Sequence, residues 1–391
     1  MLNQNVYDEL VEKFTKQYGA KPEIVSYAPG RIEVLGNHTD YNEGFVFSAA
    51  IQYGTFFAVS PRADREVRLT AGDLMKEVSY TIDKVEKRDT DTWQNYVNGT
   101  FACLFPEGTG KLAHGFNAMF LGNVPLGAGL SSSAALEMAT GKALCKLYGL
   151  EIDTVALAKA GQKAEHEYAG CPCGLLDQLS SLAGKDGQLV KSDFRSNTYE
   201  NVPLGDGVVF MMVTSPAKHA LVDGAYASRR KACEDAAAYF KTVLRHPVTH
   251  LRDVSMAEWV LYSKGLDKTT AVRAVHPIGE DERVLAGAAL LEKGDVNAFG
   301  AFMYDSHESS RNWFENSCEE LDAIVDFAKE IPEVLGARLS GGGFGGSCVL
   351  LVKPEAADRI AETINARYEA KYGNRCKISV IKASEGAHVI A

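Results

Sequence analysis

The spacing of apolar residues predicts several helices. Near the start of the chain they recur every four positions, at Leu2, Val6, Leu10 and Phe14. A second stripe consists of Leu136, Ala139, Ala143, Leu144 and Leu147. Such spacing gives a helix one apolar face, and Gly149 is a typical residue to end the second helix. Further helices are expected from Asp153 or Thr154 to about Tyr168, and over 225–244.

Short apolar runs predict strands in the second half of the chain. The continuous run 208–213 is typical of a buried strand. Near the end of the chain, helices are expected at 318–331 and 355–372, and strands at 335–339, 349–352 and 378–381. This order, α-β-β-α-β, is typical of an α+β sandwich.

The chain has 391 residues, of which 46% are hydrophobic, so it is long enough for two or three folded domains. No linker is visible in its composition. We place a boundary near 195–205, which divides the chain into an N-terminal domain, 1–200, and a C-terminal domain, 201–391. The first contains most of the polar motifs described below, and the second contains a glycine-rich one.

Charge and composition exclude several classes of function. The formal net charge of −10 repels a phosphate backbone, so nucleic acid is not an expected partner. No run of 18 apolar residues is present to span a membrane, and the first residues do not form a signal peptide, so we expect a cytoplasmic protein. The eight cysteines include no CxxC pair, which argues against a zinc ribbon.

Two glycine-rich segments predict close contact with a ligand. In PLGAGLSSSAALE, residues 125–137, glycines and serines precede a predicted helix, whose free N–H groups and dipole form an anion site. It is not a Walker A loop, and its composition also fits a turn that caps a core helix. In LSGGGFGGS, residues 339–347, five glycines lie between two predicted strands. Close backbone approach to a ligand explains them better than a flexible turn does.

Three polar segments supply candidate side chains. Arg31, His38 and Asp40 lie within APGRIEVLGNHTDYNEG, which suits either a polyhydroxylated ligand or a polar surface loop. Glu165 and Asp177 belong to AEHEYAGCPCGLLDQ, where Asp177 stands among leucines as a helix cap or as a buried carboxylate. The segment HALVDGAYASRRKACE concentrates polar groups, and its composition alone fits a solvated helix face.

Together these motifs resemble the GHMP kinases, and among them the galactokinase family. GRIEVLGNHTDYNEGFV is similar to the galactokinase signature, PLGAGLSSSAALE to the family's ATP-phosphate loop and LSGGGFGGSCV to its third motif. WQNYVNG, CGLLDQ and HALVDGAYASRRKACE also fit. The resemblance implies a two-domain α+β fold, with an N-terminal domain like ribosomal protein S5 domain 2 and a C-terminal ferredoxin-like sandwich. It also implies that ATP phosphorylates the anomeric hydroxyl of D-galactose with Mg²⁺, and we expect a monomer.

The resemblance also implies roles for individual residues. Asp177 is the expected catalytic base, with Arg31 beside it to keep it ionised and to stabilise charge on the transferring phosphoryl group. The residues expected to contact the sugar are Asn37, His38, Asp40, Gly174 and Tyr226. The residues expected to hold ATP are Trp93, Tyr96, Gly127, Gly129, Ser131, Ser132 and Ser133. Ser133 and Glu165 match the family's Mg²⁺ ligands.

The signature departs from the family pattern at two positions. Glu33 stands where Asn is usual, and Asn37 stands where the family has a Glu that accepts a hydrogen bond from the 6-hydroxyl of the sugar. An amide oxygen still accepts, but it carries no charge, so the preference at C6 is in question. The alternatives are a kinase for a C6-modified galactose or for N-acetylgalactosamine, and a catalytically silent sensor of sugar and ATP. The intact SSSAA segment and the presence of Arg31 and Asp177 argue against the sensor.

Overall fold

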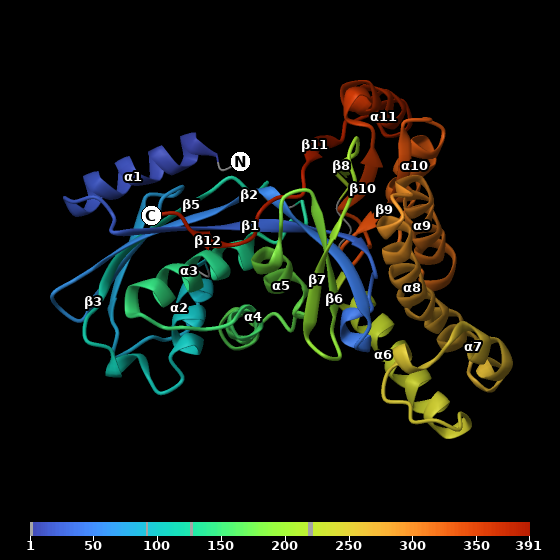
Figure 1. Cartoon of the computed structure of the whole chain (residues 1–391), viewed down its shortest axis with the longest axis horizontal. Helices are drawn as coiled ribbons and strands as arrows, with labels where there is room; N and C mark the ends of the chain where they lie inside the picture. The colour runs from blue at the N-terminus through green and yellow to red at the C-terminus, as the bar shows by residue number, and fades with distance from the viewer. Residues whose placement is uncertain (1–2, 91–92, 126–127, 218–221) are drawn as a thin grey trace.

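In the computed structural model, which describes residues 3–90, 93–125, 128–217 and 222–391, two β-sheets are covered by helices (Figure 1). The larger sheet has the order β12-β1-β2-β5-β3-β4, and the hairpin β6–β7 joins it by pairing with the first residues of β2. Its strands are β1 (Ile24–Leu35), β2 (Phe45–Pro61), β3 (Glu66–Ala71), β4 (Lys76–Thr81), β5 (Phe116–Gly122), β6 (Gln188–Asp193), β7 (Thr198–Pro203) and β12 (His388–Val389).

Helices cover both faces of the larger sheet. Helix α1 (Gln4–Tyr18) packs against β2 and β5 on one face, with Leu10 and Phe14 buried as the apolar spacing predicted. On the other face lie α2 (Trp93–Leu104), α3 (Ser132–Tyr148), α4 (Thr154–Ala164) and α5 (Leu176–Ala183) (Figure 1). The expected end of α3 at Gly149 and the cap of α4 at Asp153 are confirmed.

The helix expected to reach Tyr168 changes form before its end. It is α-helical only to Ala164 and continues as a wider π-helical turn over Glu165–Ala169. Gly170 closes this turn in a left-handed conformation, with φ 75°, and its N–H donates to the carbonyl of Glu165. The helix therefore widens from Glu165 onward and ends at Gly170.

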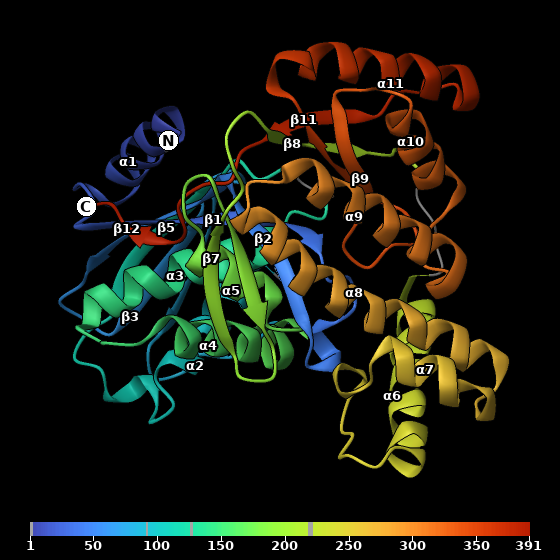
Figure 2. The same cartoon turned by 45° about the vertical axis from the view of Figure 1, so that its right-hand side comes forward.

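The smaller sheet confirms the predicted α-β-β-α-β order. It has the antiparallel order β11-β8-β10-β9, and its strands are β8 (Val209–Thr214), β9 (Val334–Ser340), β10 (Ser347–Val352) and β11 (Lys377–Ile381). The helices α10 (Glu319–Lys329) and α11 (Ala357–Tyr372) share an apolar core with these strands. The remaining helices are α6 (Val222–Val243), α7 (Met256–Tyr262), α8 (Lys268–Glu292) and α9 (Val296–Ser309) (Figure 2).

A common apolar core joins the two sheets. Ile32 of β1 and Phe47 of β2 belong to the same cluster as Phe210 of β8, Val349 of β10 and Phe299 of α9. The chain passes from the larger sheet to the smaller one between β7 and β8, and its last strand, β12, returns to pair with β1. The division at residue 200 remains a proposal. Within the described ranges, no helix has the length and apolar character needed to cross a membrane.

Candidate active site

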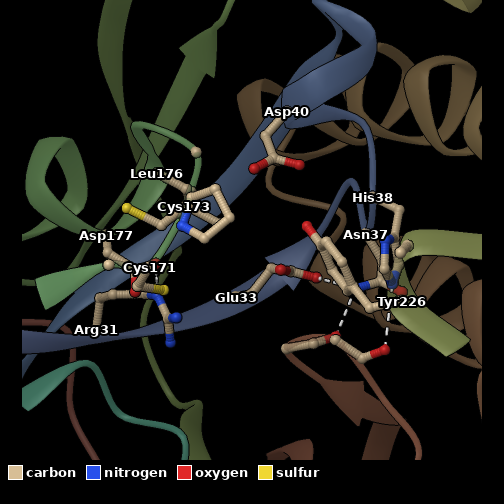
Figure 3. A pocket seen from close by; sticks show the side chains of 16 residues that line it. Arg31, Glu33, Asn37, His38, Asp40, Cys171, Cys173, Leu176, Asp177 and Tyr226 are labelled. Carbon is tan, nitrogen blue, oxygen red and sulfur yellow. Dashed lines mark hydrogen bonds and ion pairs between the residues drawn. The ribbon is translucent and has the colours of Figure 1, made fainter. Parts of the chain in front are cut away.

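A cavity of about 720 Å³ lies where β1, the start of α5, α6 and the glycine-rich loop before β10 meet. All five residues expected to contact the sugar line it: Asn37, His38, Asp40, Gly174 and Tyr226. Arg31 and Asp177 also line this cavity, and Figure 3 shows their side chains together at one side of it. The fold therefore gathers residues from four separate segments of the sequence around one space.

The expected juxtaposition of Arg31 and Asp177 is present. Nε of Arg31 donates to Oδ1 of Asp177 at 2.8 Å, and the Arg31 side chain is 10% exposed. Burial favours the neutral guanidine, but the Asp177 carboxylate outweighs this effect and raises the pKa of Arg31 above its usual value. Ser131 donates a short hydrogen bond to the second carboxylate oxygen of Asp177. Two donors thus hold the carboxylate in one orientation.

Asp40 and Gly174 fit closely against each other. A Cβ atom at Gly174 would lie 2.0 Å from Oδ2 of Asp40, so this position requires glycine. Burial, followed by the negative charges of Glu33 and Asp177, raises the pKa of Asp40 to about 6. Asp40 is thus a buried hydrogen-bond acceptor close to two other carboxylates.

His38 and Tyr226 form an aromatic wall of the cavity, with ring centroids 5.2 Å apart. Nε2 of His38 faces the carbonyl of Gly342 at 3.2 Å and therefore carries the hydrogen, while Nδ1 accepts from the hydroxyl of Tyr41 at 2.8 Å. Burial lowers the pKa of His38 to about 4. At neutral pH His38 is thus an uncharged ring fixed in one tautomer.

Asn37 lines the cavity, but its side chain is bonded to the protein. Its Nδ2 donates to Oε1 of Glu33 at 2.8 Å and to the carbonyl of Gly341 at 2.7 Å. Its Oδ1 accepts from Nδ2 of Asn316 at 3.0 Å. The sequence singled out Glu33 only as a departure from the family pattern, and the structure adds Glu33 to the cavity wall.

A second cavity, of about 500 Å³, lies beside the start of α3. Trp93 and Tyr96 of α2 line it together with Ser132 and Ser133, as expected for the nucleotide side of the site. Three other lining residues, Thr55, Asp73 and Phe120, carry no motif or spacing by which the sequence could have indicated them. They lie on or next to strands of the larger sheet, and only the strand pairing brings them to this cavity.

The serine-rich loop, residues 128–133, the last two of which begin α3, connects the two cavities. Ser131 bonds to Asp177 in the first cavity, and Ser132 and Ser133 line the second. The carbonyl of Gly129 accepts from Nη1 of Arg31 at 2.7 Å. The first N–H groups of α3 have no partner inside the helix and are available to an anion. Gly127, predicted to belong to this cradle, lies outside the described residues.

The glycine-rich third motif packs against both the protein and the first cavity. Gly341 and Gly342 line the cavity. Gly343 has φ 81°, and a Cβ there would lie 2.0 Å from the carbonyl oxygen of Asn316. Ser347 donates to the carbonyl of Ala128 at 3.1 Å, which ties this motif to the serine-rich loop. Close approach thus explains the glycines, and part of that approach is to the protein itself.

The donor set around Glu165 suits a hard cation that also has phosphate ligands. Glu165 is buried, and its Oε2 accepts from Nε2 of Gln178 at 2.8 Å and from Sγ of Cys173 at 3.1 Å. Its Oε1 has no hydrogen bond in the described part of the chain, and Ser133 supplies a hydroxyl in the first turn of α3. Among the described residues no group of three or more His, Cys, Asp or Glu could hold a metal alone. Mg²⁺ uses few protein ligands beside substrate phosphates, so this set fits it.

Family models match three parts of the chain. The galactokinase galactose-binding signature matches residues 12–61, the GHMP kinases N-terminal domain matches 95–185 and the GHMP kinases C-terminal domain matches 288–370. The first match contains Arg31, Asn37, His38 and Asp40, and the second contains the serine-rich loop and Asp177.

Solved structures are similar over nearly the whole chain. Lactococcus lactis galactokinase complexed with galactose is 30% identical, with a TM-score of 0.90, and the match covers 98% of this chain and 99% of that one. Methanococcus jannaschii mevalonate kinase is 17% identical, with a TM-score of 0.62, 92% of this chain and 98% of that one being covered. Cytophaga hutchinsonii homoserine kinase is 16% identical, with a TM-score of 0.59 and coverage of 94% and 97%. The last two show a shared fold.

Proposed function

The chain belongs to the galactokinase family of the GHMP kinases, and we propose that it transfers the γ-phosphoryl group of ATP to the anomeric hydroxyl of D-galactose. The products are galactose 1-phosphate and ADP. The observation that carries this proposal is the Arg31–Asp177 pair in the first cavity, which the serine-rich loop joins to the second. The acceptor hydroxyl and the phosphoryl donor thus have adjoining sites.

Asp177 is proposed to accept the proton of the anomeric hydroxyl as the oxygen of that hydroxyl attacks phosphorus. Arg31 and Ser131 fix the carboxylate, and Arg31 also brings positive charge to the place where the phosphoryl group is transferred. Phosphoryl transfer depends mainly on positioning and electrostatic stabilisation, and a rigid, partly buried ion pair supplies both.

The remaining wall of the first cavity is proposed to bind the sugar. Asp40 offers carboxylate oxygens to sugar hydroxyl groups, and Gly174 leaves room for them to approach. The neutral ring of His38 and the ring of Tyr226 offer a partly apolar face. A set of few polar groups against an aromatic wall is typical of a small-ligand site.

On the nucleotide side, Trp93 and Tyr96 are proposed to flank the adenine, and residues 127–133 to cradle the phosphates. Ser133 and Glu165 are proposed to hold Mg²⁺. When bound, Mg²⁺ neutralises charge on the β- and γ-phosphates. We further propose that the protein acts in the cytoplasm, in keeping with the composition of its sequence, and that it is a monomer.

A coupled ADP-release assay with ATP and Mg²⁺ tests this function. The acceptors are galactose, talose, glucose, fucose, galacturonate, galactosamine and N-acetylgalactosamine, with Asp177→Asn as the blank. We expect the highest kcat/KM on galactose and loss of turnover in the blank. A higher kcat/KM on another acceptor would reassign the substrate. Galactose binding without turnover of any acceptor would instead indicate a sensor.

A further inference from the structure

The orientation of the Asn37 amide is fixed by its neighbours. Oε1 of Glu33 and the carbonyl oxygen of Gly341 can only accept hydrogen bonds, so the NH₂ group of Asn37 must face both. Its two N–H groups are used there, and its Oδ1 faces the donor Nδ2 of Asn316. Asn37 therefore has no donor left for a ligand, and its acceptor already has one partner.

The Glu33 carboxylate is bound on one oxygen only. Oε1 accepts from Asn37 at 2.8 Å and from Nη1 of Arg338 at 3.1 Å. No hydrogen bond from any described residue reaches Oε2, although Glu33 lines the cavity. In Figure 3 the side chain of Glu33 projects from β1 into the space between the Arg31–Asp177 pair and Asn37. A carboxylate oxygen is thus left free to accept a hydrogen bond at the cavity wall.

The surroundings hold this carboxylate in place. Arg338 is fully buried and its side chain forms an ion pair with Glu33, which is itself only 7% exposed. Oε2 of Glu280 accepts from the backbone N–H groups of Gly36 and Asn37, both at 2.8 Å, so the turn that carries Asn37 is also fixed. Such fixed partners on one side leave the other carboxylate oxygen aimed in one direction.

Strand geometry places Glu33 at a suitable distance from the reacting end. Residues two apart on a strand share a face and are separated by about 6.6 Å, so Glu33 lies about one sugar ring from Arg31. If C1 of the sugar faces Asp177, as the proposed function requires, the opposite side of the ring faces Glu33 and Asn37.

We propose that Glu33, through Oε2, accepts the hydrogen bond of the sugar's C6 hydroxyl group, and that Asn37 is a positioning residue that orients the Glu33 carboxylate. The inference rests on the proposed function, because it takes the anomeric end of the sugar to be at Asp177. The charged acceptor at C6 is then present in this protein, but it comes from strand β1 instead of from the turn that follows it.

The charge of the cavity wall gives this assignment a consequence for specificity. Among the described residues, Glu33, Asp40 and Asp177 bring three carboxylates to the cavity lining, against the guanidinium of Arg31 in the lining and that of Arg338 buried behind Glu33. A neutral hydroxyl or a cationic group at C6 gains from Glu33, whereas a carboxylate at C6 is repelled by it. The proposal thus excludes uronic acids as good substrates.

The unmodified enzyme and a series of C6 analogues test the proposal without any variant. The acceptors are galactose, 6-deoxygalactose, 6-amino-6-deoxygalactose and galacturonate, each compared by kcat/KM. We expect 6-deoxygalactose to be about 10- to 100-fold worse than galactose, the range for a lost charge-assisted hydrogen bond. The kcat/KM for the amino sugar should exceed that for the deoxy sugar, and galacturonate should have the lowest kcat/KM of the series. A higher kcat/KM for galacturonate than for 6-deoxygalactose would overturn the proposal.

A matched pair of variants, Glu33→Gln and Asn37→Ala, assigns the effect to one residue. In Glu33→Gln the preference for galactose over 6-deoxygalactose should fall to within about threefold. The kcat/KM for the amino sugar should decrease, and that for galacturonate should increase. Asn37→Ala should weaken the preference for galactose over 6-deoxygalactose only in part and keep the order of the acceptors, because Arg338 still holds the Glu33 carboxylate. If Glu33 had only a structural role, Glu33→Gln would change kcat/KM for all acceptors in parallel, and this result would overturn the proposal. Loss of the preference in Asn37→Ala but not in Glu33→Gln would overturn it as well.

The same data separate this inference from the proposed function. Thermal unfolding of each variant, followed by circular dichroism, shows whether the loss of the Glu33–Arg338 pair has unfolded the protein. If galactose is phosphorylated and the C6 series is insensitive to Glu33→Gln in a folded variant, only the Glu33 assignment is wrong. If no sugar is phosphorylated by the unmodified enzyme, the proposed function itself is wrong.

Discussion

Arg31 and Asp177 are 146 residues apart in the chain, and their side chains are joined at 2.8 Å. Arg31 stands on β1 and Asp177 in the first turn of α5, which packs directly on β1. The guanidinium uses a second nitrogen, Nη1, to bind the carbonyl of Gly129 at 2.7 Å. One side chain thus ties the proposed base to the proposed phosphate loop, and this dual contact can be tested.

Arg31→Lys should lower kcat by about 10²- to 10³-fold and change the dissociation constant of galactose much less. A lysine keeps the charge but presents one compact ammonium group, so it cannot hold Asp177 and Gly129 in the same fork geometry. Steady-state kinetics and calorimetric titration with galactose measure the two effects. Arg375→Lys, at an exposed site between α11 and β11, is the control and should leave both unchanged. Equal losses in kcat and galactose affinity would contradict the assigned role.

Gly174→Ala should raise KM for galactose by about 10-fold or more. The added Cβ would lie 2.0 Å from Oδ2 of Asp40, so the carboxylate must move. Gly224→Ala is a matched control, because its added Cβ would have no atom within 4 Å. The initial rates of both variants over a range of galactose concentrations check this. An unchanged KM in Gly174→Ala would show that Asp40 does not contact the sugar.

The pH dependence of kcat/KM for galactose should reflect Asp40. Its pKa is raised to about 6 by burial and by the charges of Glu33 and Asp177, so kcat/KM should fall as the pH drops through 6 and the carboxylate becomes neutral. Asp40→Asn should remove this limb. In Glu33→Gln the limb should move to lower pH, because one of the charges that raise the pKa is gone.

The raised pKa of Asp40 makes the free energy of unfolding depend on pH in the opposite direction to kcat/KM. The pKa of folded Asp40, about 6, lies above its ordinary value of 3.8, so the folded protein binds this proton more tightly. The contribution of Asp40 to the free energy of unfolding is therefore fully present below pH 3.8 and is lost as the pH rises through 6. Urea unfolding of the wild type and of Asp40→Asn over this range should show the difference. A parallel pH dependence of the two proteins would contradict the raised pKa.

Trp93 should report nucleotide binding by its fluorescence. It lines the second cavity, whereas Trp259 of α7 and Trp313 pack against each other with ring centroids 6.5 Å apart. We expect ATP to change the emission of the wild-type protein, and Trp93→Phe to abolish this change while keeping ATP-dependent turnover measurable. Trp259→Phe is the control and should retain the signal. Retention of the signal in Trp93→Phe would show that the adenine does not bind beside Trp93 in this cavity.

Local sequence pattern was sufficient for much of the fold. The ends of α3 and α4 follow from Gly149 and Asp153, because helix caps are decided by one or two neighbouring residues. The π-helical turn after Ala164 was missed, since apolar spacing does not distinguish it from a continued helix. The pairing of β12 with β1 was missed as well, because no local pattern encodes a partner more than 350 residues away.

The candidate site was predicted only as far as motifs carry it. The residues expected to contact the sugar do line the first cavity, but the motifs assigned the C6 contact to Asn37. That assignment remains untested, and the hydrogen bonds of Asn37 now favour Glu33 instead. The difference arises because Gly341, Asn316 and Arg338, which saturate or hold these side chains, come from remote segments.

The sequence by itself determined the family, the order of the motifs and the elements on which Arg31, Asp177 and the serine-rich loop stand. These follow from residue type and spacing within short stretches of chain, which is the range over which caps, turns and periodicity act. Only the tertiary structure decided which oxygen of which carboxylate is free. That depends on competition among donors and acceptors brought together by strand pairing and helix packing, and each hydrogen bond that one partner takes is withdrawn from the ligand.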